Sequence, residues 1–543
     1  MVAALVAFVG GVAVGAGGDD PRRTVAQRFA DAWATGDYAA MHALLTPEAR
    51  RRVPLDEFSA AYREAAKIAT LDRVTAGRAA EPGEGAVAVP VTQRTRVFGT
   101  LRGRLRLPVV EREDGAAIAW GRWLVQPGLR RGERLSRRTE LPPRATIQAR
   151  DGEPIAEGEA RLSDLGPVAA EIAGRLGPAP PEQADELARR GVPEGAPVGL
   201  TGLERQFDAE LAGTPGGELL AGRRVLARAE PRRGTDVRTS IDPDIQSAAV
   251  TALAGRLGGI AVIRPSDGQV LALAGIAYSA PQPPGSVFKI ITLAGALQAG
   301  VAEPGDRYPV ETAAVLEGVQ LANAHGESCG GTLEQAFAHS CNSVFAPMGA
   351  ELGARKLVRA AEAFGFNRDP GLAGAARSTI PAAGEIGDDL ALGSTAIGQG
   401  KVLATPLEFA GVASTIAGKG VGVRPTLRKG DDARRERVIP TGVARTIGRY
   451  MRSVVTSGTG VSADIEGVKV AGKTGTAELR DTTNADPDPS AAPVSDASDT
   501  NAWFTAYAPM RRPKVAVAVM LVGQGAGGDT AAPAARTVLE AAL

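Results

Sequence analysis

The sequence contains few of the residues that bind metals or build disulfide frameworks. Among 543 residues there are two cysteines and three histidines. So few thiol and imidazole groups argue against a zinc site and against a small disulfide-stapled fold, although they leave room for one disulfide. The formal net charge is only +1, and this balance gives no indication of a nucleic-acid partner. We therefore expect no metal and no other cofactor.

Lysine is also scarce, because most of the basic residues are arginine. A lysine that stands inside a motif is therefore less easily explained by chance. The remaining composition, with 44% hydrophobic and 23% charged residues, is ordinary for globular domains. A chain of this length is expected to hold several domains with sizeable cores.

A short apolar run lies at the N-terminus. Residues 2–16 read VAALVAFVGGVAVGA, and no Lys or Arg precedes them. The run is shorter than the roughly 20 residues that a spanning helix needs, and it lacks the basic start of a secretory signal. Three interpretations are open: a membrane anchor whose cytoplasmic start is missing from this chain, a cleaved signal, or a buried helix.

The next region, residues 19–129, has the pattern of a small α+β unit. Helical apolar spacing predicts helices at 25–34, 38–45 and 58–68. Period-2 alternation then predicts an antiparallel sheet, with strands at 86–91, 94–98, 101–110 and 116–125. An Arg-rich stretch at 130–143, ending in Pro-Pro, is interpreted as a linker.

The most informative stretch follows a Pro-Pro-Gly break. Ser286 comes directly after it, Lys289 stands three residues later, and apolar residues with helical spacing continue from 290 to 297. Residues i and i+3 share a helix face, so a lysine is predicted beside a serine at a helix N-terminus. A serine becomes a nucleophile when a base takes its proton. A lysine acts as that base when burial or a neighbouring cation lowers its pKa.

The Ser-x-x-Lys pattern often arises by chance, so its weight depends on two later motifs. Residues 340–342 (Ser-Cys-Asn) alone are typical of a helix cap, and residues 473–476 (Lys-Thr-Gly-Thr) alone are typical of a strand end. In this order, the three motifs are the signature set of penicillin-binding proteins and serine β-lactamases. Residues 235–543 therefore resemble the transpeptidase domain of a class B penicillin-binding protein.

The resemblance implies a multidomain α+β fold. Residues 235–543 would form the penicillin-binding/β-lactamase-like transpeptidase domain, an antiparallel sheet with helices. Residues 144–234 resemble the penicillin-binding protein dimerisation domain, although Ala145 and Ala149 stand where that family usually has Gly and Asp. The unit at 19–129 resembles the NTF2-like N-terminal domain of MecA-type penicillin-binding proteins, and its simplest interpretation is a spacer.

The resemblance also implies a role for each motif residue. Ser286 would be the nucleophile and Lys289 the base for acylation. Ser340 would relay a proton to the leaving amine. Asn342 would hold Lys289 and the amide oxygen of the substrate. Lys473 would lower the pKa of Lys289 and attract the terminal carboxylate of the substrate.

The rest of the third motif is expected to complete the site. The hydroxyl groups of Thr474 and Thr476 would assist in binding the carboxylate. Gly475 would let the strand approach the substrate closely, since glycine has no Cβ. The N–H groups of Ser286 and Thr476 would form the oxyanion hole, where one donor contributes about 3 kcal/mol.

The function implied is that of a peptidoglycan D,D-transpeptidase, which is acylated by β-lactams and cross-links stem peptides with D-Ala-D-Ala ends. Such an enzyme would be held in the cell membrane by a single anchor in residues 1–18, with its catalytic domain extracytoplasmic, beside a SEDS-type membrane glycosyltransferase. A D,D-carboxypeptidase and a membrane β-lactam sensor are the alternatives. A β-lactamase is disfavoured because no convincing Glu-x-x-Leu-Asn follows Asn342.

A disulfide between the two cysteines is a further expectation. The compartment implied by the resemblance is oxidising, and Cys341 lies between the serine and the asparagine of the second motif. A bridge to Cys329 would hold Ser340 and Asn342 in place. The alternative is a buried Cys341 and a free thiol at Cys329.

Overall fold

The computed structural model describes residues 20–113, 115–478 and 499–543. The anchor expected in residues 1–18 lies outside the described residues. So do most of residues 480–500, whose Asp-, Pro-, Ser- and Ala-rich composition predicts a flexible loop. Within them, no helix has both the length and the hydropathy that crossing a membrane requires. The chain separates into two compact units: residues 1–144, 178–197 and 212–234 form unit 1, and residues 145–177, 198–211 and 235–543 form unit 2.

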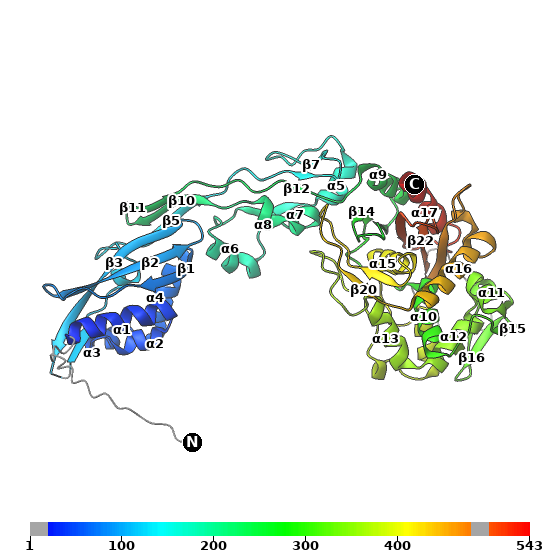
Figure 1. Cartoon of the computed structure of the whole chain (residues 1–543), viewed down its shortest axis with the longest axis horizontal. Coiled ribbons are helices and arrows are strands. Elements are labelled where there is room, and N and C mark those ends of the chain that lie inside the picture. Colours follow the sequence, from blue (N-terminus) through cyan, green and yellow to red (C-terminus); the bar gives the residue numbers. More distant parts are fainter. Residues whose placement is uncertain (1–19, 114, 479–498) are drawn as a thin grey trace, which may run out of the picture. The chain divides into compact units, whose positions relative to one another are not determined.

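Unit 1 is built on a four-stranded antiparallel sheet whose order is β1-β2-β3-β4 (Figure 1). The strands are β1 (Leu71–Ala76), β2 (Ala86–Thr95), β3 (Thr100–Arg112) and β4 (Gly115–Ile118). Helices precede the sheet: α1 (Pro21–Thr35), α2 (Tyr38–Ala43), α3 (Pro47–Arg52) and α4 (Leu55–Ile68). Every second residue of β2 is buried, so the valines of this strand pack in one core with the aromatic residues of α1 and α4.

The three helices predicted for this region are confirmed, and the strand predictions need two corrections. A separate strand at 94–98 is wrong: residues 94 and 95 belong to β2, and the chain then turns into β3. The strand predicted at 116–125 stops at Ile118, and residues 122–125 form a 3-10 turn. Strand β1 was not predicted because only Val74 of its six residues is buried.

A second sheet of unit 1 joins distant parts of the sequence. Its order is β11-β10-β5, with β5 (Leu135–Glu140), β10 (Gly216–Ala221) and β11 (Arg224–Ala229). Helix α6 (Ala184–Arg190) also belongs to this unit. Strand β5 lies in the stretch that was interpreted as a linker. The guanidinium of Arg137 there donates to the carbonyl oxygens of Lys67 and Ala188, at 2.6 Å each.

Unit 2 begins with a three-stranded sheet of the order β12-β6-β7. Its strands are β6 (Ile147–Gln148), β7 (Pro154–Ala156) and β12 (Val237–Arg238), and β12 runs parallel to β6. Three short helices accompany it: α5 (Pro167–Ala173), α7 (Gly202–Gln206) and α8 (Asp208–Leu211).

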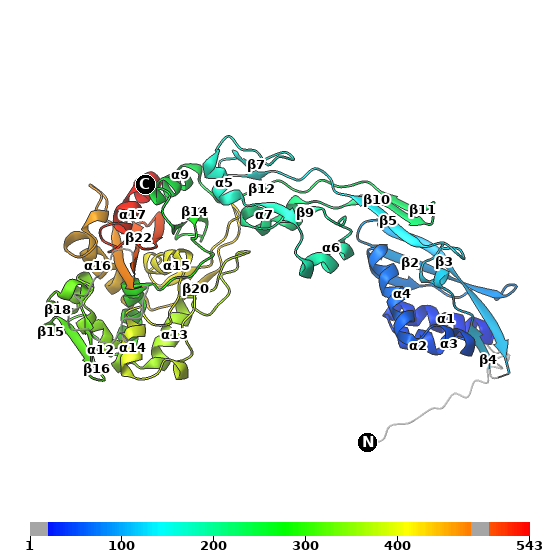
Figure 2. The ribbon, with the colours of Figure 1, turned by 180° about the vertical axis from the view of Figure 1, so that it is seen from behind.

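The central sheet of unit 2 is antiparallel and has the order β14-β13-β23-β22-β21. Figure 2 labels two of its strands, β14 and β22. Its strands are β13 (Gly258–Ile263), β14 (Val270–Gly275), β21 (Ala471–Glu478), β22 (Thr500–Ala508) and β23 (Val515–Leu521). All seven residues of β23, Val-Ala-Val-Ala-Val-Met-Leu, are buried. A strand covered on both faces is expected to be apolar throughout.

Helices cover both faces of this sheet. One face packs against α9 (Pro243–Leu253) and α17 (Ala531–Ala542), and the other against α10 (Lys289–Ala299), α15 (Pro406–Ala417) and α16 (Thr441–Ser457). The prediction of an antiparallel sheet between helices is confirmed for this domain. The apolar spacing of residues 406–417 predicts a helix, and α15 has the same bounds.

A group of small elements completes unit 2 beside the second motif. The helices are α11 (Leu333–Ala338), α12 (Asn342–Leu352), α13 (Ala354–Phe364) and α14 (Asp389–Ala396). The strands are β15 (Arg307–Glu311), β16 (Ala313–Leu316), β17 (Val319–Ala322), β18 (Cys329–Thr332), β19 (Val421–Val423) and β20 (Arg435–Arg437).

Candidate active site

The first motif forms a 3-10 turn, η3 (Gly285–Phe288), that leads directly into α10. Ser286 is half-buried in this turn. Gly285 has a φ of +55°, and a Cβ there would collide with the carbonyl oxygen of Thr476. The N–H of Gly285 donates to the carbonyl oxygen of Gly398 at 2.9 Å. The nucleophile turn is thus held between the third motif and the loop at 395–400.

The third motif lies on β21, the edge strand beneath that turn. A Cβ on Gly475 would lie 2.8 Å from the carbonyl oxygen of Pro284 and 3.0 Å from the Cβ of Trp503. The indole of Trp503 also donates to the carbonyl oxygen of Pro283 at 2.8 Å. Gly475 was expected to make room for a substrate. In the structure, the group that comes close to it is the chain's own first motif.

The second motif stands between α11 and α12 in a strained turn. Ser340 has a φ of +62°, which is unusual for a residue with a side chain. The turn is closed by hydrogen bonds from the N–H of Ser340 to Phe337 and from the N–H of Cys341 to Ala336. The left-handed backbone costs about 1 kcal/mol or more, and such strain is characteristic of functional sites.

The side chain of Lys289 points into the second motif. Its Nζ donates to the carbonyl oxygen of Ser340 and to Oδ1 of Asn342, both at 2.7 Å, and it lies 3.4 Å from Oγ of Ser340. The predicted proximity of Lys289 and Asn342 is therefore present in the structure. Among the described residues, no hydrogen bond joins Lys289 to the hydroxyl of Ser286.

Lys473 reaches the same serine from the opposite side. Its Nζ donates to Oγ of Ser340 at 2.8 Å and to the carbonyl oxygen of Thr474 at 2.9 Å. Lys289 and Lys473 are both fully buried. Each Nζ lies 5.6 Å from the centre of an aromatic ring, Phe345 for Lys289 and Phe337 for Lys473. The hydroxyl of Ser340 thus bridges two buried amino groups, each of which lies near an aromatic ring.

Both lysines titrate below their ordinary range. Burial lowers the pKa of Lys473 to about 7. Burial, and then the charge of Lys473, lower the pKa of Lys289 well below its usual value. No carboxylate among the described residues offsets either shift. Each of two buried ammonium groups this close disfavours the protonated form of the other. One of the two amines is therefore available in its neutral form as a base near neutral pH.

The buried lysines predict a pH-dependent stability. In the unfolded chain a lysine keeps its proton up to about pH 10.4, whereas folded Lys473 loses it near pH 7. Between these values the unfolded state binds more protons, so the free energy of unfolding should rise with pH by at most about 1.4 kcal/mol per pH unit for one such group. Denaturant unfolding from pH 7 to pH 9 measures this slope.

Replacing Lys473 with methionine should make that slope shallower. Lys356→Met is the matched control, because Lys356 is an exposed lysine of α13. The control should keep the slope of the unchanged chain. An equal slope in all three proteins would mean that Lys473 is protonated in the folded state throughout this range.

The predicted disulfide is confirmed. Cys329 and Cys341 are bonded, with 5.4 Å between their Cα atoms. The bridge ties β18 to the residue between Ser340 and Asn342. The hydroxyl of Ser343 adds a hydrogen bond to the carbonyl oxygen of Cys329 at 3.2 Å, so the start of α12 is attached to β18 twice.

Asn323 is a buried polar residue of the site that the sequence analysis missed. Its Nδ2 donates to the carbonyl oxygens of Glu311 (2.7 Å) and Glu327 (2.9 Å), and its Oδ1 accepts the N–H of Ser343 at 2.9 Å. The carbonyl oxygen of the preceding residue, Ala322, accepts a hydrogen bond from Nδ2 of Asn342 at 2.7 Å. These bonds fix the first turn of α12 and leave Oδ1 of Asn342 facing Lys289. No local sequence pattern marks Asn323.

Thr459 connects the second and third motifs. Its hydroxyl shares a hydrogen bond with the hydroxyl of Thr474, and its N–H donates to the carbonyl oxygen of Ala338 at 3.1 Å. A Cβ on the preceding Gly458 would collide with that same carbonyl. The Gly-Thr-Gly pattern at 458–460 is the signal that could have revealed this close approach.

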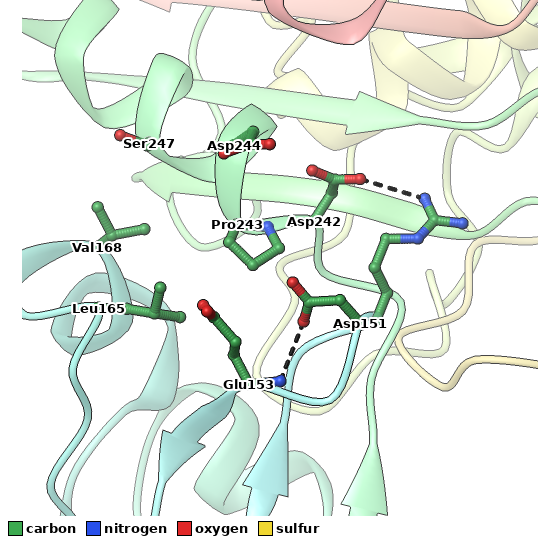
Figure 3. Close-up of a pocket in the computed structure, with 9 residues that line it drawn as sticks. Asp151, Glu153, Leu165, Val168, Asp242, Pro243, Asp244 and Ser247 are labelled. Atoms are coloured by element: carbon green, nitrogen blue, oxygen red, sulfur yellow. Dashed lines mark hydrogen bonds and ion pairs between the residues drawn. The ribbon is translucent and has the colours of Figure 1, made fainter.

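A cavity elsewhere in unit 2 is separate from these motifs. It has a volume of about 750 Å³, and Figure 3 shows the residues that line it. Arg150 pairs with Asp242 at 3.6 Å on its wall. None of its lining residues belongs to the three motifs. Among the described residues, no cluster of histidine, cysteine and acidic side chains suits a metal ion.

The geometry defines the class of the protein. A serine at a helix N-terminus, two buried lysines, and a bridging serine with an asparagine are the groups that a nucleophile, a base and a proton relay require. An edge strand beside the nucleophile has outward N–H and C=O groups that can pair with an extended substrate. This is the arrangement of a serine acyltransferase.

Comparison with known proteins identifies the family. Residues 258–540 match the penicillin binding protein transpeptidase domain, and residues 154–239 match the penicillin-binding protein dimerisation domain. The chain is 35% identical over 417 residues to the peptidoglycan D,D-transpeptidase PbpA of Mycolicibacterium smegmatis, a match that covers 63% of this chain and 79% of PbpA.

Solved structures agree with the sequence matches. The crystal structure of PBPA from Mycobacterium tuberculosis has a TM-score of 0.58 at 28% identity, covering 74% of this chain and 99% of that one. The penicillin G acyl-enzyme complex of the same M. tuberculosis protein gives the same TM-score and identity over the same shares of the two chains. The chain belongs to the penicillin-binding protein transpeptidase family, as a class B member with a dimerisation domain.

Proposed function

We propose that this chain is a peptidoglycan D,D-transpeptidase that forms its acyl-enzyme on Ser286. The observation that carries the proposal is the hydroxyl of Ser340 between two buried amino groups, Lys289 and Lys473, beside the Ser286 turn. The family match and the relatedness to PbpA support the same reaction. β-Lactams acylate the enzyme as analogues of the peptide substrate.

In the acylation step, neutral Lys289 accepts the proton of the Ser286 hydroxyl. The serine oxygen attacks the carbonyl carbon of the penultimate D-alanine, and the C–N bond to the terminal D-alanine breaks. Ser340, bonded to both lysines, passes a proton to the leaving amine. The products are an ester on Ser286 and free D-alanine, so protons and electrons balance.

The substrate would lie along β21, the edge strand. Protonated Lys473 and the hydroxyl groups of Thr474 and Thr476 attract its terminal carboxylate. The N–H groups of Ser286 and Thr476 receive the oxyanion. As the second residue of the η3 turn, Ser286 has an N–H that the turn itself does not use.

The second half-reaction separates a transpeptidase from a carboxypeptidase. An acceptor amine attacks the ester in the first case and water attacks it in the second, and either releases Ser286. Incubation with a stem peptide ending in D-Ala-D-Ala and with an acceptor stem peptide, followed by mass spectrometry, measures both products. Cross-linked dimer as the main product is expected. Hydrolysed peptide alone, at saturating acceptor, would make the enzyme a D,D-carboxypeptidase.

We further propose that the first part of unit 1 is an NTF2-like domain that acts as a spacer. Helices α1–α4 against an antiparallel sheet support this assignment. Lengthening the chain between Gln126 and Leu135 with a flexible insert should leave penicillin acylation in solution unchanged within about twofold. A tenfold loss, equivalent to about 1.4 kcal/mol in the barrier, would indicate coupling between this domain and catalysis.

Membrane attachment and a partner complete the proposal. Residues 1–18 would anchor the chain with the catalytic unit extracytoplasmic, beside a SEDS-type glycosyltransferase. Protease added to intact spheroplasts should then digest the catalytic unit, and carbonate extraction should leave the chain in the membrane. Purification from detergent-solubilised membranes should recover the glycosyltransferase. Release by carbonate, or purification without the partner after cross-linking, would contradict these two assignments.

A further inference from the structure

The outward face of the unit 1 sheet carries a row of arginines. On β3 the exposed residues Arg102, Arg104 and Arg106 alternate with residues that point toward the helices. Arg94 of β2 pairs in register with Arg73 of β1, and both are exposed. We call these five residues the arginine face. Strands β1 to β3 appear in blue and light blue in Figure 1.

The register places the five guanidinium groups on one surface. Arg94 is opposite Thr100, and the strand neighbours of Arg102, Arg104 and Arg106 are Thr92, Pro90 and Ala88. Residues two apart on a strand lie roughly 6.8 Å apart, and neighbouring strands about 4.8 Å apart. The face is therefore a grid of positive charges separated by small, uncharged side chains.

These arginines form no ion pair in the described part of the chain. No ion pair or side-chain hydrogen bond is formed by any of the five among the described residues. In sequence, β1, β2 and the first ten residues of β3 contain one carboxylate, Asp72, at the bulge next to Arg73. This contrasts with Arg22, Arg23 and Arg224 of the same unit, which are all paired with acids.

A cavity at one edge of the face extends the positive charge. It has a volume of about 680 Å³ and is lined by Arg94, Arg96 and Arg232, together with Asp72 and Glu230. Arg94 of β2, Arg96 of the turn after it and Arg232 of a distant segment thus line one opening, where three arginines outnumber two acids. Guanidinium groups bind phosphate oxygens with paired hydrogen bonds.

We propose that the arginine face binds an anionic membrane surface through the phosphate groups of its lipids. An extended grid of cations without a central pocket fits a surface of many negative charges better than one small anion. The five positions include no aromatic or large apolar anchor of the kind on which protein interfaces depend, although Val110 is exposed farther along β3. The proposal rests on the membrane attachment proposed above, and it adds a second contact that would lay the domain against the lipid.

A fluorescent label beside the face tests the contact. Thr100 is exposed between Arg94 and Arg102. Because both native cysteines are bonded to each other, Thr100→Cys in the full chain offers one free thiol for an environment-sensitive dye. The dye should respond to vesicles that contain phosphatidylglycerol, and not to phosphatidylcholine vesicles. Added salt should weaken the response, because it screens exposed charges.

Charge variants make the test specific. R102Q/R104Q/R106Q should weaken anionic-vesicle binding on the order of a hundredfold, since each basic residue near such a surface contributes about fivefold. The matched control R355Q/K356Q/R359Q removes three exposed charges from α13 of unit 2, and it should retain binding. A thermal unfolding curve for each variant confirms that the fold is kept.

Several outcomes would overturn the proposal. One is an equal dye response to both vesicle types, and another is equal loss in the two triple variants. Displacement of the vesicles by soluble polyglutamate at matched charge would assign the face to an acidic polypeptide. Insertion of residues 1–18 is measured separately, by carbonate-resistant binding to phosphatidylcholine vesicles, so failure of the anchor and failure of the face are distinguishable.

Discussion

Ser286→Ala should abolish covalent labelling by penicillin. Ser286 is the serine of the η3 turn, and the N-terminal end of α10 lies directly behind it. Removing the attacking oxygen of an acyl-enzyme mechanism typically costs a factor of about 10⁴ or more. Mass spectrometry of the digested protein should place the adduct of the unchanged chain on the peptide that contains Ser286, and should find no adduct in the variant.

Ser279→Ala is the matched control. Ser279 is an exposed serine seven positions earlier in the chain, and its loss should leave the labelling rate unchanged. Labelling of Ser286→Ala at the normal rate would move the nucleophile to another residue, of which Ser340 is the nearest alternative in the site. Far-UV circular dichroism shows whether each variant is folded.

The sequence was sufficient to predict which residues meet at the site. Ser340, Asn342, Lys289 and Lys473 come from segments up to 184 positions apart, and the structure joins them by hydrogen bonds of 2.7 to 3.4 Å. The prediction succeeded because the three motifs form a known set, and their order along the chain is typical of a single fold. The spacing of a single motif would not have placed Lys473 beside Ser340.

What the sequence could not predict is how the backbone holds these side chains. The left-handed conformation of Ser340 follows from the way α11 ends and α12 begins. Serine has no intrinsic preference for this backbone conformation, so the residue type does not predict it. Asn323 donates to two carbonyl oxygens away from the motifs and accepts the N–H of Ser343, although Asn323 itself lies about 20 residues before the second motif. Both depend on tertiary packing, which overrides local propensity.

Strand β5 shows the same limit for the fold. Its sequence, Leu-Ser-Arg-Arg-Thr-Glu, is polar enough to be read as a linker. It becomes a strand because β10, about 80 residues later, pairs with it along six residues. By contrast, β23 is apolar and buried over its whole length, and the apolar run at 515–522 is enough to predict a strand there because burial determines its composition.

Lys289→Ala should lower the second-order rate of penicillin acylation by about 10² to 10⁴, the usual contribution of a general base. Lys289 is fully buried, and burial together with Lys473 lowers its pKa well below the ordinary value. The direction of this shift favours the neutral amine, which is the form that the proposed base needs to accept the proton of Ser286. Stopped-flow acylation with a chromogenic β-lactam measures the rate.

Loss of the base must be distinguished from loss of the hydrogen bonds that position the second motif, because Nζ of Lys289 also donates to Ser340 and Asn342. Lys289→Arg separates the two. Arginine can keep a positive charge and hydrogen bonds, but it does not lose its proton in a protein. If Lys289 is the base, arginine should be as slow as alanine. A rate restored to within tenfold by arginine would show that the charge, and not the proton transfer, is what matters.

The pH profile provides an independent criterion. With Lys289 as the base, the rate on the acidic side should rise with pH as this amine loses its proton, and that limb should disappear in Lys289→Ala. On the alkaline side, the rate with a carboxylate-bearing β-lactam should fall above about pH 7, where Lys473 becomes neutral in the free enzyme. A neutral ligand should not show this decline. If Lys289→Ala keeps the acidic limb, the base is another group, and the first candidate would then be Lys473, whose Nζ is 2.8 Å from Ser340.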